Sequence, residues 1–354
     1  MKSEGNVLHN RAAEAMPMVD VLKFLFAVLI MCLHGEVFMG STGGLYFEKT
    51  IVRLAVPFFF IASGFFYGKK VYAGNDLGAV TKTYVSRLAM KLLIFEPISI
   101  LIKIAQDLVS KHLAMQTIAV EVVRNILFYP LGALWYIQAV IVAIVILVPF
   151  MKKGREDLAL VLGLVLYQFA LLCNRYYFLC EGTAVGNVVT AYMQFFISAR
   201  NGVFVGLLYV SMGVVMAKKW DVLQRKGNVT TLLVPASLLC LLLEVHVTNS
   251  KAGMDDNALF LTHLLLVPAL FLFAGRKQFA KVGNYVNAPL LRNLSTSIYL
   301  LHRPALQVVK SGFEIVFDVY LQPWQVTAIA AVAIAFVCFV IYWKKWKPFY
   351  NWIK

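Results

Sequence analysis

Two ionisable side chains, Lys23 and His34, stand inside one long apolar run near the start of the chain. On an α-helix this spacing turns the two side chains about 20° apart and separates them by about 16 Å along the axis. Ionisable groups inside a bilayer are costly and usually face a cavity or a partner. The spacing therefore predicts one polar helix face, with Lys23 near its cytoplasmic end and His34 in the outer half of the membrane.

Other polar and aromatic side chains stand at the ends of later apolar runs. If the runs alternate in direction, these ends lie at the level of His34. We predict a shared cavity there, lined by Arg53, Trp135, Tyr136, Glu244, His263, His302 and Arg303. The structural interpretations stay open: a lone histidine can bridge helices, the aromatic pair can mark the membrane interface, the arginines can extend to the headgroups, and the glutamate can neutralise an arginine.

The composition indicates whether these groups belong to a soluble protein or to a membrane protein. Of the 354 residues, 60% are hydrophobic and only 14% are charged, and the mean hydropathy is +0.75. A soluble domain is closer to half apolar and a quarter charged. The chain is therefore not expected to be a soluble enzyme, a disordered protein or a secreted disulfide scaffold, and the composition predicts an α-helical integral membrane protein.

We expect an all-α, polytopic membrane bundle of about ten transmembrane helices, because about 20 apolar residues cross a bilayer. The candidate spans are 17–37, 51–67, 88–109, 131–150, 157–174, 201–217, 230–248, 258–275, 288–309 and 324–343. Residues 1–354 are expected to form one membrane-embedded domain, with spans from about 17 to 343 and short cytoplasmic tails. The first run lacks a small-residue cleavage site, so we interpret it as a retained span.

The charge pattern predicts the orientation. About two thirds of the 33 Lys and Arg residues fall in alternate loops on one side, which by the positive-inside rule is the cytoplasm. This places both termini inside. The net charge of +15 is then a topology signal, and we expect no nucleic-acid partner. The five cysteines show neither zinc nor redox spacing, so we expect unpaired thiols and no metal site.

Four segments carry a resemblance when taken in order. They are Lys23-x10-His34, Arg53-x3-Pro57-Phe58-Phe59-Phe60-x2-Ser63-Gly64, Leu134-Trp135-Tyr136 and Ser295-Thr296-Ser297-Ile298-Tyr299-Leu300-Leu301-His302. Together they resemble the membrane-bound acyltransferase family 3 over nearly the whole chain. Two departures are visible. The family usually has arginine where Lys23 stands, and it often has a denser basic cluster where this chain has Arg87-x3-Lys91-x5-Pro97.

The resemblance implies an enzyme of the bacterial plasma membrane. It would move an acyl group, commonly acetyl, from cytoplasmic acyl-CoA to a hydroxyl of an extracytoplasmic glycan or related acceptor, without a permanently bound cofactor. His34 would act as general base, with Arg53 and then His302 as candidates to stabilise the oxyanion. The CoA phosphates would meet Lys23, Arg87 and Lys91. The acceptor would be bound by Glu244, Trp135, Tyr136 and Arg303.

A narrower likeness supports a rival function. Residues 190–213, which contain Arg200-Asn201-Gly202, are similar to the membrane domain joined to serine racemases of the vancomycin-resistance type. That domain has been regarded as an amino-acid importer. Because the chain ends after its last expected span, we expect no pyridoxal-phosphate racemase domain. The alternative function is therefore import of a small polar solute such as L-serine, with the buried polar groups lining its path.

Overall fold

The computed structural model describes residues 16–109, 123, 128–131, 133–225 and 227–343. All regular elements within these ranges are helical, which confirms the expected all-α class. This is what a bilayer requires, because a helix satisfies its own backbone N–H and C=O groups where water is absent. The tails expected at the two ends of the chain lie outside the described residues.

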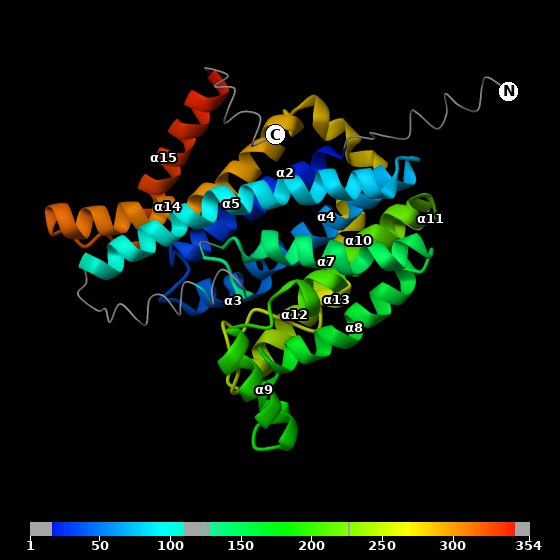
Figure 1. The fold of residues 1–354 in the computed structure, drawn as a ribbon, viewed down its shortest axis with the longest axis horizontal. Helices are drawn as coiled ribbons and strands as arrows, with labels where there is room; N and C mark the ends of the chain where they lie inside the picture. Colours follow the sequence, from blue (N-terminus) through cyan, green and yellow to red (C-terminus); the bar gives the residue numbers. More distant parts are fainter. Residues whose placement is uncertain (1–15, 110–122, 124–127, 132, 226, 344–354) are drawn as a thin grey trace. The chain divides into compact units, whose positions relative to one another are not determined.

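Figure 1 shows the helices in chain order, coloured from blue to red. Their bounds are α2 (Pro17–His34), α3 (Thr42–Thr50), η2 (Val52–Leu54), α4 (Ala55–Tyr72), α5 (Leu77–Val109), α7 (Trp135–Lys152), α8 (Glu156–Leu172), η3 (Tyr177–Leu179), α9 (Ala184–Phe196), η4 (Gly202–Gly206), α10 (Leu207–Lys218), α11 (Trp220–Arg225), α12 (Gly227–Thr248), α13 (His263–Ala274), η5 (Lys277–Asn284), α14 (Ala288–Phe317) and α15 (Pro323–Trp343).

Each of the ten candidate spans coincides with a helix over much of its length. Five helical stretches in the described residues are long and apolar enough to cross a membrane: Pro17–His34, Thr42–Tyr72, Trp135–Lys152, Asn228–Thr248 and Pro323–Ile341. The full count of ten and the orientation with both termini inside stay predictions.

The eighth candidate span, 258–275, is helical only in part. The helix α13 has 12 residues, so it is about 18 Å long and shorter than a hydrocarbon core of about 30 Å. The non-helical stretch before it keeps its polar backbone groups bonded, because Tyr167 donates to the Phe260 carbonyl at 3.1 Å and Glu244 accepts from Leu261 N–H and Thr262 N–H. Side chains thus replace the helix where the apolar pattern predicts one.

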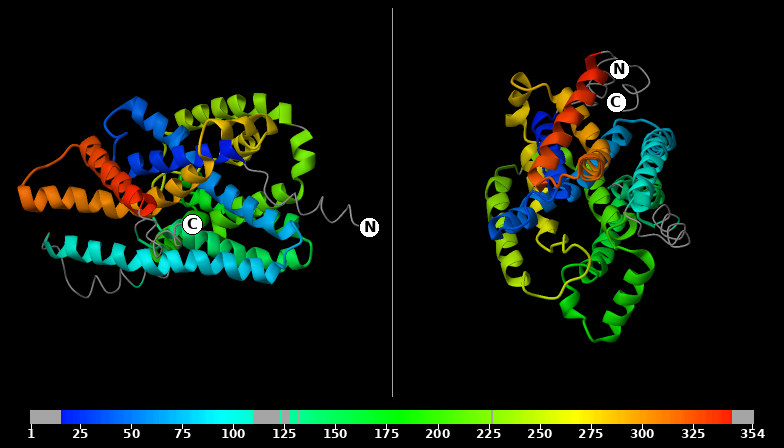
Figure 2. Two further views of the ribbon diagram at one scale, coloured as in Figure 1. Left: turned by 90° about the horizontal axis from the view of Figure 1, so that it is seen from above. Right: turned by 90° about the vertical axis from the view of Figure 1, so that its left-hand side faces the viewer.

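The chain divides into two compact units, and each is considered by itself. The first unit comprises residues 1–19, 56–89 and 136–286, and the second comprises residues 20–55, 90–135 and 287–354. In the first unit, α8 packs against α10 and α12 packs against α13. In the second unit, α14 and α15 pack together as consecutive helices, which are orange and red in Figure 2. The single domain expected over 1–354 stays a prediction.

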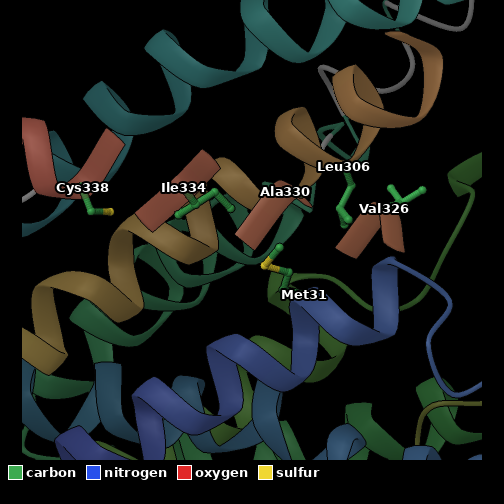
Figure 3. Close-up of a cluster of buried hydrophobic side chains, with 6 residues drawn as sticks. All are labelled: Met31, Leu306, Val326, Ala330, Ile334 and Cys338. Carbon is green, nitrogen blue, oxygen red and sulfur yellow. The ribbon is translucent and has the colours of Figure 1, made fainter. Parts of the chain in front are cut away.

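An apolar cluster within the second unit holds three helices together. Figure 3 shows Met31 of α2 pointing toward side chains of α14 and α15, and the buried members are Met31, Leu306, Val326, Ala330, Ile334 and Cys338. Burying such side chains contributes about 1.5–3 kcal/mol each in a soluble core, whereas in lipid tight packing is the main stabilising term. The cluster fixes the end of α2 against the middle of α14.

Candidate functional site

The helices α2 and α14 are tied together by polar contacts at their first turns. The Arg292 guanidinium donates to both carboxylate oxygens of Asp20, from Nε at 2.9 Å and from Nη2 at 2.7 Å. One turn further along both helices, the Ser295 hydroxyl donates to the Lys23 carbonyl at 3.1 Å. Because these contacts advance together along the chain, the two helices run in the same direction.

The same pair of helices brings two histidines together. The rings of His34 and His302 stack with centroids 5.3 Å apart and planes inclined by 22°. His34 is the last residue of α2 and is partly buried, whereas His302 lies in the middle of α14 and is fully buried. The structure thus joins two residues from opposite ends of the sequence that were expected to share a site.

The backbone of α14 orients the His302 ring. Nδ1 lies 3.0 Å from the Ile298 carbonyl oxygen and 2.8 Å from the Tyr299 carbonyl oxygen. On the opposite edge, Nε2 is buried and has no hydrogen-bond partner among the described residues. One edge of this imidazole is therefore used by the helix, and the other edge is available to a ligand.

Gly35 allows α2 to end this close to its neighbours. A Cβ atom at this position would overlap the Thr327 hydroxyl oxygen of α15, and it would lie 3.2 Å from Thr327 Cβ and 3.3 Å from Leu306 Cδ2. Real Cβ contacts are seldom that short, so any larger residue would push the end of α2 away. The glycine directly after His34 thereby sets the distance between the two imidazole rings.

Arg303, the residue after His302, adds a buried donor. Its Nε has no hydrogen-bond partner among the described residues, and its guanidinium interacts electrostatically with Glu36 and Tyr129. The Tyr129 ring in turn stacks on Trp135, with centroids 5.6 Å apart and planes inclined by 11°. Three residues predicted for the site, His302, Arg303 and Trp135, therefore belong to one connected group.

Two further side chains hold the segment before α7 in place. The Tyr299 hydroxyl donates to the Ala133 carbonyl at 2.6 Å, and Glu96 Oε1 accepts from Leu131 N–H at 2.9 Å. Ala133 has a φ of +68°, a left-handed conformation that costs a non-glycine residue about 1–2 kcal/mol. These bonds help to keep Trp135 beside the group around Arg303.

The cations expected to bind the acyl donor differ in their surroundings, although Arg87 and Lys91 lie one turn apart on α5. Lys23 lies within electrostatic range of Lys91, Arg292 and Asp20, so three cations and one carboxylate gather in the second unit. Arg87 belongs to the first unit, where its side chain is exposed. The chain thus collects a positive group around Lys23, and Arg292, which was not among the predicted site residues, is part of it.

Arg53, the first candidate for the oxyanion, is held by a neighbour on the preceding helix. Its Nη2 lies 2.6 Å from Glu48 Oε1, and the side chains are 13% and 15% exposed. This largely buried ion pair compensates the Arg53 charge locally. Compared with Arg303 Nε, its guanidinium is less available to a developing oxyanion.

Three other predicted lining residues belong to the first unit. Glu244 accepts bonds from the Tyr176 hydroxyl, from Leu261 N–H at 2.6 Å and from Thr262 N–H at 2.9 Å. The Tyr136 hydroxyl donates to the Phe59 carbonyl at 3.0 Å, and the His263 ring packs on Phe260 with centroids 5.3 Å apart. These contacts show what the three side chains do for the packing of their own unit. Their predicted part in a shared cavity stays a prediction.

Five residues that position the site, rather than form it, were not predicted from the sequence. They are Asp20, Gly35, Glu96, Tyr299 and Arg292. One of them, Asp20, could have been predicted, because it lies about one helical turn before Lys23 and therefore shares its helix face. The part of the chain that the structure describes contains no group of three His, Cys, Asp or Glu residues suited to a metal, and its five cysteines are free thiols.

Comparison with known proteins gives a family and two relatives. The chain matches the acyltransferase 3 family, described as an acyltransferase domain, over residues 17–343. An amino-acid racemase of Enterococcus faecalis is 25% identical over 258 residues, which covers 72% of this chain and 34% of the relative. A serine/alanine racemase of Enterococcus gallinarum is 25% identical over 300 residues, which covers 80% and 40%. The chain thus spans less than half the length of these relatives. No solved structure matches.

Proposed function

We propose that this chain, which belongs to the acyltransferase 3 family, transfers an acyl group across the bacterial plasma membrane from acyl-CoA to a hydroxyl of an extracytoplasmic glycan or related acceptor. The family and the apolar helices make it a multi-pass membrane protein. The observation that carries the proposal is the stacked pair of His34 and His302 beside the buried donor Arg303 Nε.

The reaction needs a base, because an alcohol is a poor nucleophile at neutral pH. His34 accepts the hydroxyl proton as the oxygen attacks the thioester carbonyl carbon, a role commonly worth about 10²–10⁴ in rate. Negative charge then develops on the former carbonyl oxygen. The C–S bond breaks, the acyl group stays on the acceptor oxygen, and the CoA thiolate takes the proton back from His34.

The developing oxyanion needs a donor within the membrane. Arg303 is the better candidate, since it directly follows His302 on α14, whereas the Arg53 guanidinium is paired with Glu48 through Nη2. One such donor in a site without water is typically worth about 10²–10³ in rate. This changes the order given by the sequence, which put Arg53 first.

The acyl donor is expected to bind at the other end of α2. Lys23 and Lys91 lie there near the ion pair of Arg292 with Asp20, and phosphates prefer charge-assisted contacts with such cations. Lys23 precedes His34 by about 16 Å along the helix, so a thin pantetheine arm could extend from the cations toward the histidine pair. Acetyl-CoA is the donor that we would test first.

A second function follows from the relatives. Both racemases act on amino acids by their names, and this chain is similar to the part of them that it covers. Import of a small amino acid such as L-serine would use the same buried polar groups as a path.

A vesicle assay separates the two functions. The purified chain is reconstituted, acetyl-labelled CoA is supplied on one side, and a panel of nitrophenyl glycosides is supplied on the other. We expect labelled glycoside with the wild type and with Ser311→Ala, a control on α14 that removes only a hydrogen bond from Gln106. We expect none with His34→Ala.

A parallel set of vesicles receives labelled L-serine in place of the acyl donor. Serine uptake without acyl transfer to any acceptor would replace the enzyme by the importer. Acyl transfer at the normal rate by His34→Ala would remove His34 from the mechanism.

A further inference from the structure

The buried edge of His302 has a defined hydrogen-bonding character. The two atoms within reach of Nδ1 are the carbonyl oxygens of Ile298 and Tyr299, at 3.0 Å and 2.8 Å. Carbonyl oxygens accept hydrogen bonds and cannot donate them, so Nδ1 must carry a proton to bond with either. The neutral ring then has a lone pair on Nε2.

A proton on Nε2 would have no acceptor. This atom is buried and has no hydrogen-bond partner among the described residues, and the residue itself is 0% exposed. A buried N–H that is left unpaired destabilises the folded protein. The backbone bonds and the surroundings of Nε2 therefore favour the same tautomer, with the proton on Nδ1.

We infer that His302 is a binding residue for the acyl acceptor, and that its Nε2 accepts a hydrogen bond from an O–H group of that acceptor. This inference rests on the proposed function and changes the role expected from the sequence, which was donation to the oxyanion. A ring protonated on Nδ1 cannot donate from Nε2.

His302 and Arg303, which are consecutive residues of α14, then have different roles. Arg303 Nε is an open donor that fits a carbonyl oxygen, and His302 Nε2 is an open acceptor that fits a hydroxyl. The stacked His34 ring, with its centroid 5.3 Å away, takes the proton of the reaction. The acceptor must accordingly present a hydroxyl donor to His302. Replacing that hydroxyl by a methoxy group should weaken its binding about tenfold to hundredfold.

Two substitutions test the two nitrogens of the His302 ring separately. His302→Asn places an amide N–H near the position of Nδ1 and removes the acceptor at Nε2. His302→Gln places an amide oxygen near the position of Nε2 and restores an acceptor that is not a base. We expect His302→Asn to lower kcat/KM for a nitrophenyl glycoside about tenfold to hundredfold, as loss of one buried hydrogen bond does. We expect His302→Gln to recover most of the activity that His302→Asn loses, and the control Ser311→Ala to stay within a few-fold of the wild type.

A spectroscopic measurement tests the tautomer without any turnover. In the detergent-solubilised chain labelled with ¹⁵N-histidine, the His302 signals are identified by their loss in His302→Gln. We expect a protonated Nδ1 and an unprotonated Nε2 at neutral pH. A protonated Nε2 would overturn the inference, and so would equal loss of activity in His302→Asn and His302→Gln with both variants folded. Absence of transfer in the wild type, with the expected tautomer present, would instead count against the proposed function.

Discussion

Two polar regions, Glu244 with its bonded partners in the first unit and His302 with Arg303 in the second, differ in their hydrogen bonding. In the first unit, the Glu244 carboxylate accepts three hydrogen bonds from Tyr176, Leu261 and Thr262. In the second unit, His302 Nε2 and Arg303 Nε are buried without a described partner. Both regions were expected to line the same cavity, because the sequence shows only which polar residues lie in apolar runs.

The difference separates polar groups that stabilise the fold from those available for chemistry. A carboxylate with its oxygens bonded to backbone N–H groups replaces missing helix bonds and has little capacity left for a substrate. A buried nitrogen without a partner costs free energy, and such a cost is retained where a ligand recovers it. The comparison predicts that substitutions in the second region reduce activity and that those in the first reduce stability.

The largest effect on activity outside the reacting residues is expected from Gly35→Ala. The added methyl group would overlap the Thr327 hydroxyl, so the end of α2 and the His34 ring must move. A displacement of about 1 Å at a reacting group can lower the rate about 10²-fold. The measurement is kcat/KM for acyl transfer, together with the unfolding temperature in detergent.

A second substitution checks the cause. Thr327→Ala removes the overlapping oxygen, so the double variant Gly35→Ala with Thr327→Ala should recover most of the activity. A double variant that is no better than Gly35→Ala would show that the contact with Thr327 does not set the ring distance.

Glu244→Ala should affect stability far more than turnover. It leaves the partly buried Tyr176 hydroxyl and Thr262 N–H and the exposed Leu261 N–H without their acceptor, and an orphaned group costs up to about 1–3 kcal/mol where it is buried. We expect a much lower unfolding temperature and a nearly unchanged kcat below it. A stable variant with a raised KM for the acceptor would instead support the substrate-binding role that was predicted for Glu244 from the sequence.

The contrast also shows how far the sequence could lead. Long apolar runs determine the helices, because lipid leaves the backbone no other partner. The spacing of Lys23 and His34 predicted a shared helix face, and the levels of the span ends predicted that His34 and His302 line one cavity, but the stacking of their rings was not predicted. The sequence does not show whether a polar side chain has hydrogen-bond partners, because Glu244 and His302 both appear only as polar residues near the end of a span. Most of their partners are backbone groups, whose positions in space cannot be inferred from residue types.

Tyr299→Phe tests how strongly the second region depends on its support. It removes the bond from the hydroxyl to the Ala133 carbonyl, at 2.6 Å, and keeps the ring whose centroid lies 6.2 Å from that of His302. One such bond is worth about 1 kcal/mol. We expect activity to fall several-fold, with most of the stability retained. Loss of activity as complete as in His34→Ala would give Tyr299 a direct role in the reaction.

The smallest effect concerns an ion pair of the first unit that lies outside the candidate spans. Burial by itself would raise the pKa of the Glu156 carboxyl, but hydrogen bonds from Lys218 at 2.7 Å and Tyr72 at 2.9 Å outweigh it and hold that pKa below its usual value. A carboxyl with a lowered folded pKa stabilises the protein above its unfolded pKa of about 4.3, and this contribution is lost as the pH falls through the folded pKa.

Lys218→Met should therefore lower the free energy of unfolding by up to about 1 kcal/mol at neutral pH, because the lysine is 39% exposed and solvent screens its charge. The difference from the wild type should shrink as the pH falls through the lowered pKa of Glu156, below which this carboxyl is protonated in both proteins. Lys219→Met is the matched control, since its ion pair with Asp157 is 52% and 64% exposed and should contribute almost nothing. Neither variant should change acyl transfer at neutral pH. A drop in kcat with Lys218→Met alone would contradict the assignment of fold stability to the first unit's polar contacts and of chemistry to the second.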